Sequence, residues 1–226
     1  MRRTETRRRY DDACGTAHGL ELVGDRWALL VARELMFGPR RFVDLKRDLK
    51  GISANVLSER LDGLLRTGVI QRLRLPPPAS VMAYALTPWG AELEPVIVEL
   101  GRWAARSPGH DPRLPLSAAS IMLSLRAMFR PERAVGVAAT LAFHFGDERF
   151  IAHVSPRGVE TRRAGDTDGP DATVTGTPES VAAWLYGGQT RDALEAAEVL
   201  ALDGDPAAAA AFAGCFALPP KAGTGG

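Results

Sequence analysis

Small polar and amide side chains gather at the start of one predicted helix, where their chemistry suits the reading of nucleic-acid bases. The helix is predicted over residues 53–67. Among the side chains off its apolar stripe are Ser53, Asn55, Ser58 and Arg60. Asn pairs through two hydrogen bonds with adenine in the major groove, and Ser accepts several partners. For each residue taken singly, an ordinary solvated helix face is the alternative.

Arginines recur at every second position of a predicted strand farther along the chain. Residues 69–75 alternate with the period of two that a half-exposed strand shows, and Arg72 and Arg74 fall on one face. Guanidinium groups in that position can bind phosphates. Plain surface arginines are the alternative.

Two short helices joined by a tight turn would position the base-reading side chains. The first ends near Gly51 and the second begins at Ser53, a favoured N-cap residue. The second carries an apolar stripe at helical spacing: Val56, Leu57, Leu61, Leu64 and Leu65. Strands at 69–75 and 81–86 flank a proline-rich tip. This order predicts a winged helix-turn-helix over residues 14–106, with its second helix presented to the major groove.

A long helix is predicted to close this domain, from about Pro88 to Arg106. Its apolar residues recur at spacings of three and four: Leu93, Val96, Ile97, Leu100 and Trp103. In a domain of this size such a stripe is either core or the seam of a dimer. Two-fold pairing would place two recognition helices about one DNA turn apart.

Six blocks of this region, in order, resemble the HxlR-type bacterial transcription regulators. They are residues 22–27 (LVGDRW), 35–42 (LMFGPRRF), 51–53 (GIS), 57–61 (LSERL), 68–70 (GVI) and 84–90 (YALTPWG). The resemblance implies a dimeric winged-helix protein that binds double-stranded DNA. It implies DNA-facing roles for the four helix residues and for Arg40 and Arg41, and places Arg72 and Arg74 in the wing. Some relatives sense oxidants through an N-terminal cysteine, but Cys14 is followed here by Gly15, and an inert cysteine is the alternative.

Charge is divided unevenly along the chain. Residues 1–106 hold 18 Lys and Arg against 13 Asp and Glu, whereas residues 107–226 hold 10 against 14, so a net charge of +1 hides a basic first half. A basic half that contains the helix-turn-helix suits binding to phosphates. Residues 1–13 resemble a basic arm that follows a groove, with a merely solvating tail as the alternative. No apolar region typical of a secretory signal or a membrane span follows it.

A second domain is expected after a proline-rich linker at 107–116. Residues 117–130 predict an amphipathic helix. Strands are predicted at 135–145, 149–154, 159–163, 171–175 and 199–202, with helices at 178–187 and 206–216. The fold class is therefore α+β: a winged helix-turn-helix, then a small domain at 117–218 whose mainly antiparallel sheet is backed by helices, and a disordered tail at 219–226.

The second half also resembles sterol-carrier-protein type 2 domains, in its turns at 143–148, 158–159, 171–174, 178–180, 187–188 and 202–205. That family holds lipid-like molecules in an apolar tunnel. Eight residues are candidates to line such a pocket: Met122, Leu125, Met128, Phe129, Phe143, Phe150, Trp184 and Phe212. A well-packed core made of the same residues is the alternative.

The leading hypothesis is a cytoplasmic, homodimeric, sequence-specific transcription regulator controlled by a hydrophobic small molecule. One alternative is a lipid or metabolite carrier whose winged helix mainly dimerises. Another is a regulator whose second domain has no pocket and serves oligomerisation. His144 and His153 are isolated on predicted strands, and HExxH, CxxC, P-loop and GxGxxG motifs are absent from the sequence. We therefore expect no enzyme, no cofactor, no metal site and no membrane partner.

Overall fold

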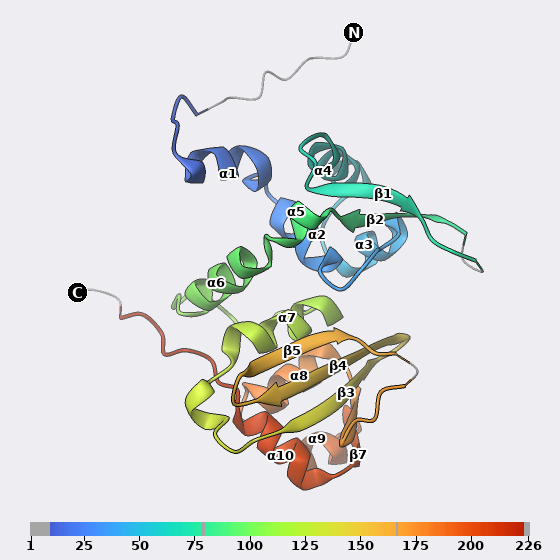
Figure 1. Cartoon of the computed structure of the whole chain (residues 1–226). Coiled ribbons are helices and arrows are strands. Elements are labelled where there is room, and N and C mark those ends of the chain that lie inside the picture. The colour runs from blue at the N-terminus through green and yellow to red at the C-terminus, as the bar shows by residue number, and fades with distance from the viewer. Residues whose placement is uncertain (1–9, 78–79, 166, 224–226) are drawn as a thin grey trace. The chain divides into compact units, whose positions relative to one another are not determined.

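The chain forms two compact units, Met1–Leu93 and Glu94–Gly226 (Figure 1). The computed structural model describes residues 10–77, 80–165 and 167–223 of the 226. Most of the predicted basic arm therefore lies outside the described residues. The units divide earlier than the predicted linker at 107–116, because the helix that precedes this linker packs with the second unit.

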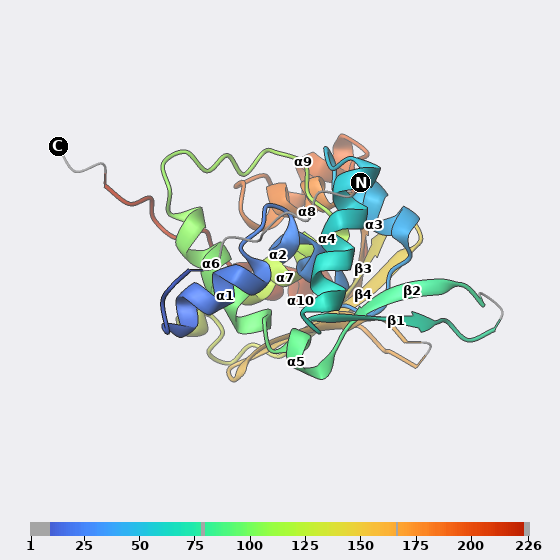
Figure 2. The same ribbon diagram turned by 90° about the horizontal axis from the view of Figure 1, so that it is seen from above.

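The first unit contains the predicted helix-turn-helix and wing. Its elements are α1 (Gly15–Val23), α2 (Ala28–Leu35), α3 (Phe42–Asp48), α4 (Ala54–Arg66), β1 (Ile70–Arg74), β2 (Met82–Leu86) and α5 (Pro88–Ala91). Strands β1 and β2 pair in antiparallel register, with Arg72 opposite Tyr84. They extend away from α3 and α4 in both ribbon views (Figures 1 and 2).

Local chemistry accounts for the ends of α4. The Ser53 hydroxyl accepts a hydrogen bond from the backbone N–H of Val56 at 3.2 Å, which satisfies one of the donors left over in a first helical turn. Gly51 before the helix has φ +91°, and Gly68 after it has φ +74°. Both values lie in the left-handed region that favours glycine, so the turn and the helix end depend on these two residues.

One apolar core holds the first unit together. Leu57, Leu61 and Leu64 of α4 are almost fully buried, as the stripe predicted. The other buried members of this core are Ala28, Val31, Leu35, Leu45, Leu49, Ile52, Val69 and Ile70. Burial of these side chains fixes the rotation of α4 about its axis, and so decides which of its residues reach solvent.

The predicted closing helix is two helices, which corrects the expectation of a single one. Helix α5 ends at Ala91, and α6 (Glu94–Ala105) begins after Glu92 and Leu93. Pro95 explains the break: it has no N–H to donate to the carbonyl of Ala91, and its ring would collide with that carbonyl in a continuous helix.

The second unit is an α+β fold built on a five-stranded sheet. After α6 come α7 (Ala118–Met128), the 3₁₀ turn η1 (Pro131–Arg133), β3 (Ala139–Phe145), β4 (Glu148–Ser155), β5 (Gly158–Arg163), β6 (Ala172–Gly176), α8 (Pro178–Leu185), α9 (Arg191–Ala196), β7 (Leu200–Gly204) and α10 (Pro206–Gly214). The strand order is β5-β4-β3-β6-β7, and every pair is antiparallel except β3 with β6. The predicted elements all appear, β3 begins four residues late, and α9 was not predicted.

Helices pack on one face of this sheet. Helix α7 contacts β4 and β5, α10 contacts β3 and β6, and α8 contacts both of these helices (Figure 1). The buried sheet residues include Phe143 and Phe150, which are paired across β3 and β4. His144 and His153 alternate with the buried positions and are partly exposed on the other face.

The predicted linker and tail are both more ordered than expected. Residues 107–116 form turns, and the Leu116 N–H donates to the Glu179 carboxylate at 3.0 Å. In the tail, Lys221 Nζ donates to the carbonyls of Ala105, Ser107 and His110 at 3.0–3.1 Å. Lys221 therefore attaches the described part of the predicted tail to the backbone carbonyls at and after the end of α6.

Candidate nucleic-acid interface

Helix α4 presents a solvent-exposed stripe opposite its buried leucines. Asn55 and Ser58 lie on this stripe near the N-terminal end and are exposed, as predicted. Ser53 is exposed too, but its hydroxyl oxygen already accepts the Val56 N–H as the helix cap. The stripe therefore offers one amide and one hydroxyl to a partner that approaches the start of α4.

Acidic side chains limit how much of this stripe suits a phosphate-lined groove. Glu59 and Asp62 are exposed in the middle of α4. Asp62 accepts a hydrogen bond from the Arg72 guanidinium of β1 at 3.3 Å, so wing and helix are in contact. The Arg72 guanidinium also lies 5.6 Å from the centre of the Tyr84 ring. These contacts hold Arg72 beside α4 and partly neutralise it.

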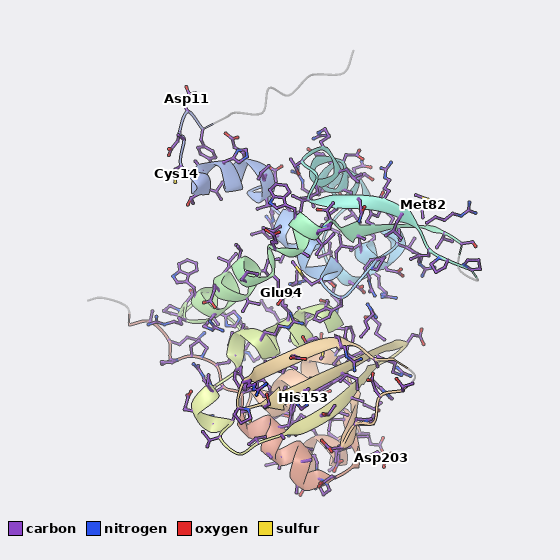
Figure 3. The ribbon with its side chains drawn as sticks, in the orientation of Figure 1. Asp11, Cys14, Met82, Glu94, His153 and Asp203 are labelled. Carbon is purple, nitrogen blue, oxygen red and sulfur yellow. The ribbon has the colours of Figure 1, made fainter. Side chains whose placement is uncertain are left out.

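Arg74 differs from Arg72 in that its hydrogen bond is with a backbone carbonyl and not with a carboxylate. It is exposed near the end of β1, and its Nε donates to the carbonyl of Ser80 at 3.2 Å. Met82, its partner across the wing, is also exposed (Figure 3). A side chain bonded only to a backbone carbonyl keeps its full positive charge for a phosphate.

Two arginines predicted to face DNA are paired within the first unit. Arg40 is 9% exposed and forms an ion pair with Asp48 of α3, while its backbone pairs with that of Tyr84 in β2. Arg60 forms ion pairs with Asp25 and Glu59, and its Nε is buried without a hydrogen-bond partner among the described residues. Both guanidinium groups brace the first unit and do not extend from it.

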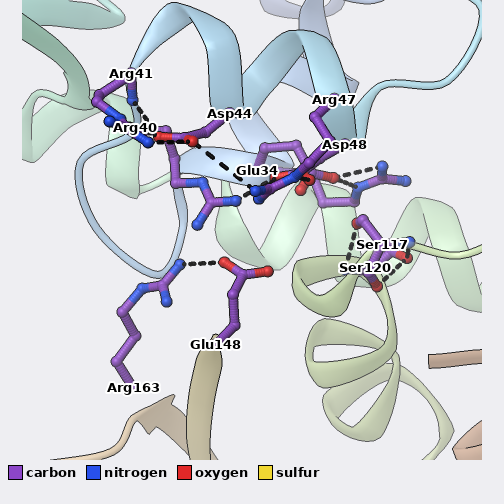
Figure 4. A network of polar contacts seen from close by, with 11 residues as sticks. Glu34, Arg40, Arg41, Asp44, Arg47, Asp48, Ser117, Ser120, Glu148 and Arg163 are labelled. Carbon is purple, nitrogen blue, oxygen red and sulfur yellow. Dashed lines mark hydrogen bonds and ion pairs between the residues drawn. The ribbon is translucent and has the colours of Figure 1, made fainter. Parts of the chain in front are cut away.

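Arg41 lies at the start of α3, where a polar network joins it to Asp44 (Figure 4). Two guanidinium nitrogens of Arg41 donate to the Asp44 carboxylate at 2.8 and 2.9 Å. These hydrogen bonds are the main cause that holds the pKa of Asp44 below its usual value. Half of the Arg41 side chain stays exposed, so it remains a candidate for phosphate contact.

Basic residues that flank the turn between α3 and α4 were not among the predicted DNA-binding residues. Arg47 is exposed at the end of α3, and Lys50 is exposed just before Gly51. These two residues lie outside both the exposed stripe of α4 and the wing. Their position in the sequence could have indicated a role, because residues that flank the turn lie next to the start of α4.

Most of the net positive charge of the first unit comes from its first nine residues. These hold five arginines and one glutamate, whereas residues 10–93 hold 11 Lys and Arg against 10 Asp and Glu. The described part of the winged helix-turn-helix is therefore close to neutral. Electrostatic attraction to DNA would therefore depend on the basic residues 1–9 and on individual cationic side chains of the helix-turn-helix and wing.

Cys14 is exposed at the N-cap position of α1 (Figure 3). Hydrogen bonds from the backbone N–H groups of Thr16 and Ala17 lower the pKa of its thiol, since they stabilise the thiolate at the start of the helix. Cys215, in contrast, is buried, and burial raises the pKa of its thiol. The two cysteines thus differ in accessibility and in acidity.

The eight candidate pocket residues come together in the second unit. Met122, Leu125, Phe143, Phe150 and Phe212 are fully buried, Met128 is 5% exposed, and Phe129 and Trp184 are partly buried. Their aromatic rings are in contact: the Phe143 and Phe212 centroids are 5.8 Å apart, and the Phe129 ring meets the Phe216 ring edge-on at 6.2 Å. Phe143, Phe150 and Phe212 are buried where α7 and α10 cover the sheet, whereas Met128 packs with Ala105 and Ala127 in a separate cluster.

The described residues contain no group of three or more His, Cys, Asp or Glu side chains arranged to bind a metal ion. Over the same ranges, every helix is too short or too polar to cross a membrane.

Comparisons with known proteins match the first part of the chain. Residues 22–111 match the sequence model of the HxlR-like helix-turn-helix family. An uncharacterized HTH-type transcriptional regulator of Mycobacterium tuberculosis is 44% identical over 84 residues, which cover 37% of this chain and 52% of that protein. YvaP of Bacillus subtilis, also named an uncharacterized HTH-type transcriptional regulator, is 34% identical over 85 residues, which cover 38% of this chain and 79% of YvaP.

Among solved structures, the reduced form of the transcriptional regulator YodB from Bacillus subtilis is similar to this chain. It has 31% sequence identity and a TM-score of 0.39, and the match covers 44% of this chain and all of that chain. The chain spans about half the length of the mycobacterial relative that it matches.

Proposed function

The chain belongs to the HxlR-like helix-turn-helix family, and from this premise we propose that it is a transcription regulator that binds specific sequences of double-stranded DNA. One observation carries the proposal: α4 exposes Asn55 and Ser58 near its N-terminus while the wing presents Arg72 and Arg74 from an adjoining strand pair. Amide and hydroxyl groups suit base edges, and guanidinium groups suit phosphates.

In the proposed complex the start of α4 enters the major groove and the wing lies along the backbone. At 1.5 Å per residue the 13 residues of α4 span about 20 Å, enough to cross the groove. Arg41, Arg47 and Lys50 would add phosphate contacts beside the helix. Arg40 and Arg60 take no part, because their paired side chains are only 10% and 16% exposed.

The proposed active form is a homodimer. Apolar side chains are exposed on α6: Val96, Leu100 and Trp103 are 52%, 43% and 72% exposed. Leu20 of α1 is 50% exposed, and so is Trp89 of α5, which lines an apolar cleft of about 200 Å³. Apolar surface of this kind favours self-association. A regulator of this class acts on chromosomal DNA, so we place it in the bacterial cytoplasm and assign it no catalytic role.

Base reading is tested by Asn55→Ala and Ser58→Ala. Duplexes selected from a randomised library with the wild-type protein would be compared with single-base variants by fluorescence anisotropy. Each substitution is expected to reduce discrimination at one position of the site, with loss of about 1–3 kcal/mol for a good base contact. Gln189→Ala, which removes an exposed amide of the second unit, is the matched control. Unchanged discrimination in both α4 variants would refute this assignment.

For the second unit we propose a sterol-carrier-like domain that binds a hydrophobic small molecule and so controls DNA binding. Support comes from its α+β order and from the shared apolar interior of Met122, Leu125 and Phe143 between helices and sheet. A ligand regulates only if it has different affinities for two states of the protein. A carrier function, or a solid core used for oligomerisation, remains the alternative outcome.

Thermal melting distinguishes these outcomes. Fatty acids, sterols and polyketide-like aromatics would be added to the wild type and to Leu125→Trp. A ligand that binds only the native state adds about 2.7 kcal/mol at a hundredfold excess over its dissociation constant. Loss of that shift in a folded Leu125→Trp variant would support the sensor. No shift for any compound, with Leu125→Trp destabilised by about 1–3 kcal/mol or more, would point to a solid core.

A further inference from the structure

Helix α6 has two faces with different partners, and this division suggests how the second unit reaches the DNA-binding function. Val98, Arg102 and Ala105 follow one another at helical spacing and pack toward α7. A second face of the helix carries Val96, Leu100 and Trp103, which are exposed. Each of them comes two residues before its counterpart on the first face, so the two faces are about 200° apart around the helix axis. The first face is therefore held, while the second is available for association.

Arg102 anchors the held face to the end of α7. Its Nε donates to the carbonyl of Ala127 at 2.8 Å, and a terminal nitrogen donates to the carbonyl of Arg126 at 3.2 Å. The last carbonyls of a helix have no partner within it and carry partial negative charge. A guanidinium that binds two of them is a strong and directional attachment.

Two further cations fasten the ends of α6 to the same unit. At its start, Glu94 forms an ion pair with Arg126 of α7, whose Nε donates to the Thr161 hydroxyl of β5 at 2.8 Å. At its end, Lys221 binds three carbonyls, including that of Ala105. Helix, sheet and tail of the second unit thus all contribute to the attachment of α6.

The chain passes between the two units within a single peptide bond. Leu93 packs against the apolar core of the first unit, whereas the next residue, Glu94, is ion-paired to α7 of the second. Only Glu92 and Leu93 separate α6 from α5, which directly follows the wing.

Helix α7 joins this attachment to the apolar interior of the second unit. Ala127 and Met128 pack with Ala105 of α6, while Met122 and Leu125 of the same helix are buried in the interior described above. Packed interiors transmit displacement because they contain little free space. A change in that interior would move α7, and α6 with it.

We propose that α6 is a regulatory lever: it moves as one body with the second unit, and the state of that unit sets the position of its exposed Val96, Leu100 and Trp103 stripe in the dimer. The inference rests on the proposed function, because it names how the second unit would regulate DNA binding. Helix α6 lies within the family match at residues 22–111. The proposal nevertheless requires that the stability of α6 depend on the second unit and not on the first.

A crossover hydrogen-exchange experiment on the full chain tests the attachment without DNA. Leu125→Ala creates a cavity in the second unit and Leu57→Ala creates one in the first, and both leucines are fully buried in the wild type. Amides of residues 96–105 are expected to exchange at least about tenfold faster in Leu125→Ala and at the wild-type rate in Leu57→Ala. The opposite pattern, or equal acceleration in both variants, would overturn the proposal.

A second experiment tests the lever itself. Arg102→Gln removes the attachment to α7 on the face opposite the exposed stripe, and Arg106→Gln is the matched control at the end of the same helix. Lys221→Gln is a second variant, which removes the positive charge that binds the carbonyls at the end of α6. Each would be studied by sedimentation and by anisotropy with a duplex selected from a randomised library. Arg102→Gln and Lys221→Gln are expected to weaken dimerisation and duplex binding at least threefold, with Arg106→Gln unchanged.

The outcomes separate the lever from the proposed function. Wild-type dimerisation and duplex affinity in both variants, together with faster exchange of α6, would refute the lever and leave the proposed function intact. A wild-type protein that binds no selected duplex would refute the proposed function and, with it, the regulatory part of this inference. The exchange crossover would still decide to which unit α6 is attached.

Discussion

Removal of the Arg74 guanidinium provides a quantitative test of the wing. Arg74→Ala deletes an exposed charge at the end of β1 that, among the described residues, is bonded only to the Ser80 carbonyl, so none of these residues is left as a buried unpaired partner. Each phosphate contact contributes about 0.9 to the slope of log affinity against log salt. A homodimer loses the contact twice, so the slope should fall by about 1.8. Between 50 and 200 mM salt, the ratio of wild-type to variant affinity should then fall by about 12-fold.

The assay is fluorescence anisotropy with one selected duplex and one scrambled duplex, each titrated at several salt concentrations. Because a phosphate contact carries no base information, the loss should be equal for the two duplexes. Asp62→Asn should raise the affinity for both duplexes. The substitution removes the carboxylate that pairs with Arg72 and also removes a negative charge from the exposed stripe of α4.

Arg113→Ala is the matched control, since Arg113 is an exposed arginine paired with Asp111 in the second unit. It should leave the slope unchanged. An Arg74→Ala slope equal to that of the wild type would refute the reasoning that the wing contacts phosphate. A loss confined to the selected duplex would instead mean that Arg74 reads bases.

Three further outcomes follow from particular contacts. Ser53→Ala removes the cap of α4 and should lower the free energy of unfolding by about 1 kcal/mol in urea denaturation, whereas Ser53→Asp should not. Cys14 should react with iodoacetamide in the native protein at a lower pH than in the unfolded chain, and Cys215 should react only after unfolding; equal native rates would contradict this. Hydrogen bonds from Arg41 depress the pKa of Asp44, so this carboxylate stabilises the fold above its unfolded pKa, near pH 4, and that contribution is lost as pH falls through the folded value. Urea midpoints at pH 7 and pH 3 should therefore differ less in Asp44→Asn than in the wild type.

Local features of the winged helix-turn-helix were predictable because their causes lie within a few residues. Ser53 caps the helix that follows it, and Gly51 and Gly68 adopt positive φ where the chain turns. The leucine spacing of α4 identified its buried face, and that alone left Asn55 and Ser58 exposed. Capping, turn chemistry and hydrophobic period are properties of neighbouring residues, so one sequence contains them.

The ion pairs of two predicted DNA-facing arginines have a different physical cause. Arg40 and Arg60 look like surface arginines in the sequence, yet their partners, Asp48 and Asp25, come from other elements. An ion pair depends on which side chains the fold brings within a few ångströms, and spacing along the chain carries no record of that distance. The same holds for β3 and β6, whose parallel pairing joins strands separated by two others in sequence.

The attachment of α6 shows most clearly what only the tertiary structure decided. From its sequence, α6 is an amphipathic helix with an apolar stripe, and the stripe serves equally well as core or as a seam. Which of its faces is held depends on Arg102 meeting the end of α7 and on Lys221 returning from 116 residues away to the carbonyl of Ala105. The sequence by itself determined that these residues form a helix with two unlike faces. The long-range contacts of its cations decided to which unit it belongs, because a helix end binds whichever charge the rest of the fold places beside it.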